Sequence, residues 1–83
     1  MDNTVSIEWS DGRIDSAESW EALEEKVRAY QWWDLSEDEF RADMQKRAWR
    51  WSHTRILTTG TSQQFFAELA RARLVAIVNT RGD

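Results

Sequence analysis

Strand patterns occur at both ends of this 83-residue chain, and a helical period fills the sequence between them. Near the N-terminus, Val5, Ile7 and Trp9 alternate with polar residues, which indicates a half-buried strand over 4–9. Near the C-terminus, residues 74–78 form a continuous apolar run of strand length, typical of a central strand. We therefore predict one compact α+β domain over 1–83, in which these strands pair and the helices cover one face of the sheet.

A first helix is predicted over 17–31, because apolar residues recur there at helical spacing. The residues of this apolar stripe are Trp20, Leu23, Val27 and Tyr30. Either Asp15 or Ser16 is the expected N-cap, since its side-chain oxygen can accept hydrogen bonds from the first turn. Glu24 and Arg28 stand one turn apart in the favourable order, and we expect them to form an ion pair.

Two capping boxes predict where the other helices begin. The sequence Ser-Glu-Asp-Glu at 36–39 opens a helix over 36–51, and Thr-Ser-Gln-Gln at 61–64 opens one over 61–72. In the helix over 36–51, one face carries Phe40, Met44, Ala48 and Trp51, whereas Trp49 lies roughly opposite. Because Trp side chains lie on both faces of this helix, we expect both faces to form contacts.

Two short segments have weaker strand patterns. Residues 13–15 follow an Asp-Gly turn and are expected to return as a second strand. Residues 55–58 are compatible with a third strand. The predicted core combines the apolar faces of all these elements: Trp20, Leu23, Val27, Phe40, Met44, Trp51, Phe65, Leu69, Val75 and Ile77.

Charge is distributed unevenly along the chain. Residues 1–39 contain twelve acids and three bases, whereas residues 40–83 contain eight bases and three acids. One interpretation is that an acidic half packs beside a basic half and each stabilises the other. The alternative is that the basic half binds an anionic partner.

Catalysis and metal binding have little support in the sequence. The chain has no cysteine, its only histidine is His53, and its three glycines are isolated. The acidic cluster at 34–39 does not have the spacing of a calcium loop, and helix capping explains it. We expect no enzyme activity, no cofactor, no metal and no small-molecule substrate.

Binding of another protein is the function that the composition favours. Six of the 83 residues are Trp, more than one small core needs, and Trp and Arg are enriched at interface hot spots. The expected interface residues are Trp32, Trp33, Trp49 and Arg50. At least one of these three Trp side chains should be exposed in the isolated chain and covered by a partner or a second copy, which makes a homodimer the simplest form.

Nucleic-acid binding is the alternative. Residues 46–55 carry four cations and two Trp, and such a segment can neutralise phosphates and stack on bases. The candidate residues are Lys46, Arg47, Trp49, Arg50, His53 and Arg55. The connection over 52–61 is too long for a helix-turn-helix, although a winged-helix variant stays open.

Arg47 falls on the apolar side of its helix, together with Met44. Three explanations stay open for it. Its stem extends along the apolar surface to solvent, it pairs with a carboxylate of the acidic half, or it marks an interface.

Three segments of the chain resemble small proteins of unknown function encoded by bacteriophages of mycobacteria and related actinobacteria. They are Trp-Ser-Asp-Gly at 9–12, Lys-Arg-Ala-Trp-Arg-Trp-Ser at 46–52 and Phe-Phe-Ala-Glu-Leu-Ala-Arg at 65–71, and the preference for Arg over Lys adds to the likeness. The resemblance implies a phage product that binds a host or phage protein and has no catalytic residues. With neither a signal-peptide pattern nor a run of about 20 apolar residues, we expect a soluble protein in the host cytoplasm.

Overall fold

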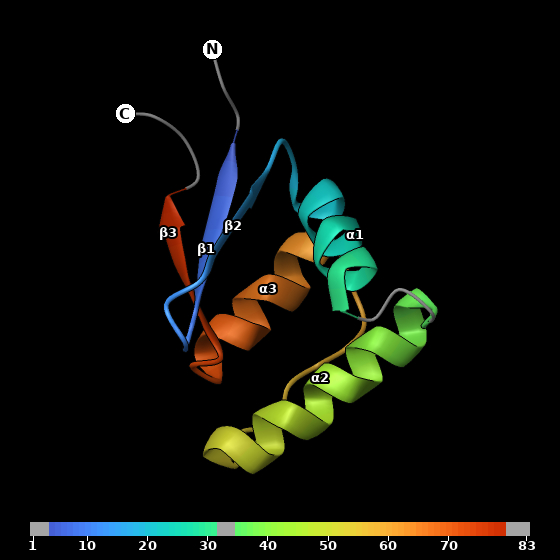
Figure 1. Cartoon of the computed structure of the whole chain (residues 1–83). Coiled ribbons are helices and arrows are strands. Elements are labelled where there is room, and N and C mark those ends of the chain that lie inside the picture. Colours follow the sequence, from blue (N-terminus) through green and yellow to red (C-terminus); the bar gives the residue numbers. More distant parts are fainter. Residues whose placement is uncertain (1–3, 32–34, 80–83) are drawn as a thin grey trace.

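The computed structural model describes residues 4–31 and 35–79, and it has the α+β architecture predicted from the sequence. Strands β1 (Val5–Trp9) and β2 (Ile14–Ala17) are followed by helices α1 (Trp20–Gln31), α2 (Glu37–Ser52) and α3 (Ser62–Arg71), and strand β3 (Val75–Asn79) ends the described chain. The three helices lie on one face of the sheet (Figure 1). The predicted return strand after the Asp-Gly turn is confirmed as β2.

The sheet has the order β2-β1-β3, with antiparallel pairing on both sides of β1. Val5 and Ile7 of β1 point toward the helices and are buried, and Ile7 pairs with Ile77 of β3. The register shifts between Ser6 and Ile7, so Val78 has no direct partner and β3 bulges there. The order also makes β3 an edge strand rather than the central strand predicted for 74–78, and Ile77 of this strand, expected in the core, is 39% exposed.

The core lies between the sheet and the helices. Helix α1 packs against β2 and α3, and α3 packs against β3. Helix α2 joins them through long side chains, with the Phe40 ring centroid 5.9 Å from that of Phe65. The buried apolar residues are Val5, Ile7, Leu23, Val27, Phe40, Met44, Ala48, Ile56, Phe65, Phe66, Leu69, Ala72, Leu74 and Val75. None of the helices in the described ranges is long and apolar enough to cross a membrane.

Two aromatic residues expected to face the core are instead exposed. Trp51 is 57% exposed, and its indole N–H donates to the carbonyl of Arg73 at 3.1 Å, because the last turn of α2 extends along the surface past the core. Tyr30 is 63% exposed at the end of α1, where the guanidinium of Arg13 lies over its ring. Helical spacing predicts which side of a helix these residues occupy, but it does not predict where along the helix the core ends.

The start of α1 also differs from the prediction. Ser19, rather than Asp15 or Ser16, caps the helix, and its hydroxyl accepts from the Ala22 N–H at 3.0 Å. Asp15 and Ser16 belong to β2, where the Asp15 carboxylate accepts from the indole of Trp9 and the Ser16 hydroxyl bonds to that of Ser6. Extension of the strand therefore delays the helix until Trp20.

The connection between α2 and α3 is not a strand, contrary to the expectation for 55–58. Side chains of the helices, rather than a neighbouring strand, bind its backbone. The amide of Gln45 donates to the Ile56 carbonyl at 2.9 Å, and the Leu57 N–H donates to the carboxylate of Glu68 at 3.0 Å. We call residues 53–61 the connector. Both predicted capping boxes are present, at Ser36 before α2 and at Thr61 before α3.

Candidate functional site

The strongest candidate for a binding site lies at the C-terminal half of α2. Met44 and Ala48 are buried and hold one side of the helix against the core, so the opposite side faces solvent. Trp49 is 49% exposed there. The helix ends at His53, whose backbone is left-handed (φ 55°) and whose N–H donates to the Trp49 carbonyl. A packed face and a defined end therefore hold the exposed indole in place.

Five residues line an open hollow of about 660 Å³ beside this indole, which we call the Trp49 hollow: Gln45, Lys46, Trp49, Arg50 and Arg55. Four of them come from α2. Arg55 comes from the connector, which is held in place by the Gln45–Ile56 hydrogen bond and by a 2.8 Å bond from Arg71 to the Arg55 carbonyl. The His53 ring packs edge-on against Trp49, with centroids 5.2 Å apart.

The hollow is cationic. Within the described residues, Lys46, Arg50 and Arg55 form no ion pair with a carboxylate. Arg71, by contrast, contacts Glu68 at 2.7 Å, and this ion pair lowers the pKa of Glu68 and raises that of Arg71. The three cations provide positive charge for an anionic partner, and the indole between them provides apolar surface.

The structure thus brings together most of the candidate residues. Trp49 and Arg50, expected at a protein interface, share the hollow with Lys46 and Arg55, two of the nucleic-acid candidates. The exposure that the interface prediction requires is present at Trp49. Trp32 and Trp33 lie outside the described residues.

Arg47 does not belong to this group. Its side chain pairs with Asp43, one turn earlier on α2, at 3.2 Å. It lines a separate cleft of about 150 Å³ with residues of the β1–β2 hairpin. The carboxylate in this ion pair, Asp43, belongs to the basic half of the sequence and not to the acidic half that the pairing explanation named.

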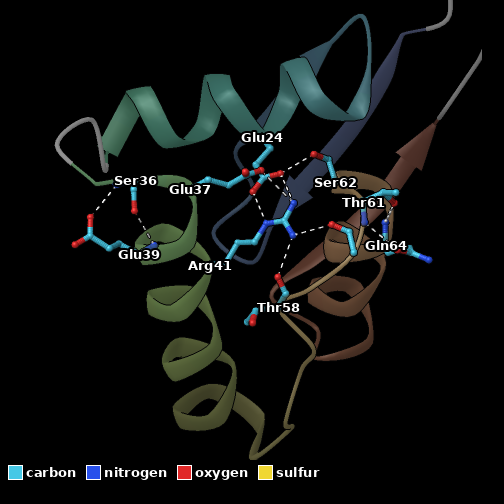
Figure 2. A network of polar contacts seen from close by, with 10 residues as sticks. Glu24, Ser36, Glu37, Glu39, Arg41, Thr58, Thr61, Ser62 and Gln64 are labelled. Atoms are coloured by element: carbon cyan, nitrogen blue, oxygen red, sulfur yellow. Dashed lines mark hydrogen bonds and ion pairs between the residues drawn. The ribbon is translucent and has the colours of Figure 1, made fainter.

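A second polar cluster, which sequence reasoning missed, lies inside the molecule (Figure 2). Arg41 donates through Nε and Nη2 to the carboxylate of Glu24 at 2.7 and 2.8 Å, and the hydroxyl of Ser62 donates to the same carboxylate at 2.6 Å. The remaining guanidinium nitrogen, Nη1, donates to the carbonyls of Thr58 and Gly60. Glu24 therefore pairs with Arg41 and not with Arg28, contrary to the prediction.

The Arg41–Glu24 cluster is structural. Burial by itself raises the pKa of Glu24, but the hydrogen bonds from Arg41 and Ser62 and the charge of Arg41 outweigh it, so the pKa lies below its ordinary value. The hydrogen bond to Glu24 raises the pKa of Arg41. Every polar group of the pair has a partner, so the cluster holds α1, α2 and the connector together and has no group left to bind a ligand. The position of Arg41 beside Phe40, near the core side of α2, is the only sequence signal that could have indicated it.

No family model, curated protein or solved structure matches this chain. In the described part of the chain, no three His, Asp or Glu side chains come close enough together to hold a metal ion. Within the described residues, the Trp49 hollow places exposed aromatic surface among three cations that form no ion pair with a carboxylate.

Proposed function

We propose that this protein is a non-enzymatic interaction module and that it binds another protein chain through the Trp49 hollow. The observation that supports this most directly is the half-exposed indole of Trp49 on a well-packed helix, with Lys46, Arg50 and Arg55 around it. Trp and Arg together contribute most at the centre of protein interfaces, where the ring supplies apolar area and the cation supplies directed hydrogen bonds. The charge of the hollow selects an acidic segment of the partner.

Nucleic acid is the second candidate, because an exposed ring among cations can stack on a base while the cations meet phosphates. The surroundings of the hollow favour protein. Nucleic-acid affinity grows with each phosphate neutralised, yet the neighbouring Arg47 and Arg71 are already paired with carboxylates. In addition, exposed Asp38 and Glu39 continue the same side of α2 and would repel a phosphate backbone that follows the helix.

The resemblance to actinobacteriophage proteins extends the proposal to the setting. On that ground, the partner is a host or phage protein and the complex forms in the host cytoplasm. The binding chemistry proposed for the hollow does not depend on this origin.

Photocrosslinking tests the proposal directly. A benzophenone amino acid replaces Trp49 in one variant and Tyr30 in a control, since Tyr30 is an exposed aromatic residue outside the hollow. After irradiation in bacterial cells, position 49 should form a defined adduct that resists nuclease and is digested by protease. The adduct should be lost when Arg50→Glu is added, and it should be absent at position 30. Equal labelling at both positions, or none at position 49, would contradict the proposal.

A second measurement decides between the two candidates, using fluorescence anisotropy of labelled single-stranded DNA and RNA at low salt. If the hollow binds nucleic acid, affinity should fall steeply with added salt, and Arg50→Glu should abolish binding. Arg47→Glu, a matched change outside the hollow, should leave most of it intact. We expect no binding above background at about 50 mM salt.

A further inference from the structure

The exposed side of α2 carries a regular stripe of four residues, Asp38, Ala42, Lys46 and Trp49, which we call the α2 stripe. They follow one another at intervals of four, four and three residues, so they lie on one face of the helix. All four are exposed, and the buried Met44 and Ala48 lie on the opposite side of α2. The stripe is therefore a face that the fold of a single chain leaves unpacked.

The order of residues in the α2 stripe makes it complementary to itself. Ala42 is the smallest, and Asp38 and Lys46 lie one turn before and one turn after it. When two copies of α2 are placed antiparallel and cross at Ala42, Asp38 of each copy faces Lys46 of the other. A two-fold axis repeats every contact, so the dimer contains two Asp38–Lys46 ion pairs.

The same arrangement covers the exposed indole. Trp49 lies seven residues after Ala42, and α2 begins at Glu37, five residues before Ala42, so each indole lies beside the start of α2 in the second copy. Leu35, which precedes that start, is only partly buried and packs against the core of its own chain. A small residue at the crossing lets the helices approach to about 8 Å, and antiparallel helix dipoles attract.

From this charge and shape complementarity, we infer that the protein partner is a second copy of this chain, bound through antiparallel packing of the α2 stripe into a two-fold dimer. The inference rests on the proposed function, because it names the chain that covers Trp49. The contact is isologous and closes with two copies, so it does not extend into a filament.

Charge reversal is the first test, with mass measured by light scattering and sedimentation. The wild type should be a dimer. Asp38→Lys and Lys46→Asp should each weaken it by roughly tenfold or more, because each places two pairs of like charges in the interface. The double variant Asp38→Lys/Lys46→Asp should regain dimerisation, since the reversed pairs attract again. Glu21→Lys is the matched control, an exposed acid in the first turn of α1, and it should leave the dimer intact.

Cysteine crosslinking is the second test, and the absence of native cysteine makes it clean. Ala42→Cys should form a covalent dimer with mild oxidant or a short bifunctional crosslinker, because the residue lies beside its own copy at the axis. Ala67→Cys, an exposed alanine of α3, should stay monomeric under the same treatment.

A wild type that stays monomeric, or a dimer that survives both single charge reversals, would overturn the inference. Equal crosslinking at positions 42 and 67 would also overturn it. These outcomes separate it from the proposed function. If position 49 crosslinks to a protein of another mass while the wild type is monomeric, the interaction module stands and the dimer falls. If position 49 captures no protein, both fall.

Discussion

The pair formed by Glu24 and Arg41 shows how single residues organise this small fold. Both side chains are almost fully buried, at 3% and 7% exposure, inside a chain of 83 residues. Desolvation of two charges is costly unless geometry and further hydrogen bonds compensate. Here Ser62 and two connector carbonyls complete the hydrogen bonding, and the guanidinium lies 4.8 Å from the centre of the Phe65 ring. One arginine therefore sets the relative positions of α1, α2 and the connector.

Acid should weaken the fold through Glu24. Its pKa in the folded protein lies below the ordinary value of 4.5. The unfolded chain therefore binds the proton more tightly, and the contribution of Glu24 to stability is lost as the pH falls from about 5 through the folded pKa. In urea titrations at decreasing pH, Glu24→Gln should be about 3 kcal/mol less stable at pH 7 and should show a shallower acid dependence than the wild type.

The control for this experiment is Glu21→Gln, which removes an exposed carboxylate from the same helix. Its acid dependence should match that of the wild type. If the free energy of unfolding changes with pH in the same way for Glu24→Gln and the wild type, the Glu24–Arg41 pair contributes nothing to the pH dependence of stability.

At the scale of elements, capping and side-chain contacts to the backbone decide where helices start and where the connector runs. Helices α2 and α3 both begin with reciprocal bonds between the N-cap and the third residue of the helix. The N-cap of α3, Thr61, directly follows Gly60, whose φ of 99° is a conformation that glycine adopts without strain. Gly60 thus provides the left-handed backbone at the end of the connector, and Thr61 caps α3 directly after it.

Thr61→Ala should lower the free energy of unfolding by about 1 kcal/mol, because the Gln64 N–H loses its acceptor. Thr59→Ala, at an exposed connector position two residues earlier, should change it by less than about 0.5 kcal/mol. Chemical denaturation of the two variants measures the difference. Equal losses would mean that the capping box does not stabilise α3.

At the scale of the whole molecule, one apolar layer joins the sheet to the helices, and charge is separated along α2. Acids occupy the first turn of α2, and the cations of the Trp49 hollow lie around its last two turns. This polarity suits the helix dipole, and it also places opposite charges at the two ends of the α2 stripe. The same separation of charge therefore stabilises α2 and supplies the opposite charges that pair in the proposed dimer.

Loss of core volume should be costly, since a domain of this size has little stability to spare. Leu69 is fully buried, and Leu69→Ala should lower the free energy of unfolding by about 2–5 kcal/mol. Leu57 is 65% exposed, so Leu57→Ala should cost less than about 1 kcal/mol. A loss under about 1 kcal/mol for Leu69→Ala, measured by urea unfolding, would contradict the core described above.

Local sequence patterns predict most of the secondary structure and much of the candidate site. Strand alternation, helical spacing and capping boxes act between residues at most four apart, so the three helices, β1 and β3 could be predicted from neighbours alone. Lys46, Trp49 and Arg50 share a face for the same reason, because one helix positions all three.

The contacts between elements depend on tertiary packing. Arg41 binds Glu24, which lies 17 residues away, and Arg55 reaches the hollow only because helix side chains hold the connector backbone. Trp51 is exposed because its turn of α2 passes beyond the edge of the core. No local pattern encodes where a neighbouring element ends, so burial at such edges and long-range ion pairs follow from packing alone.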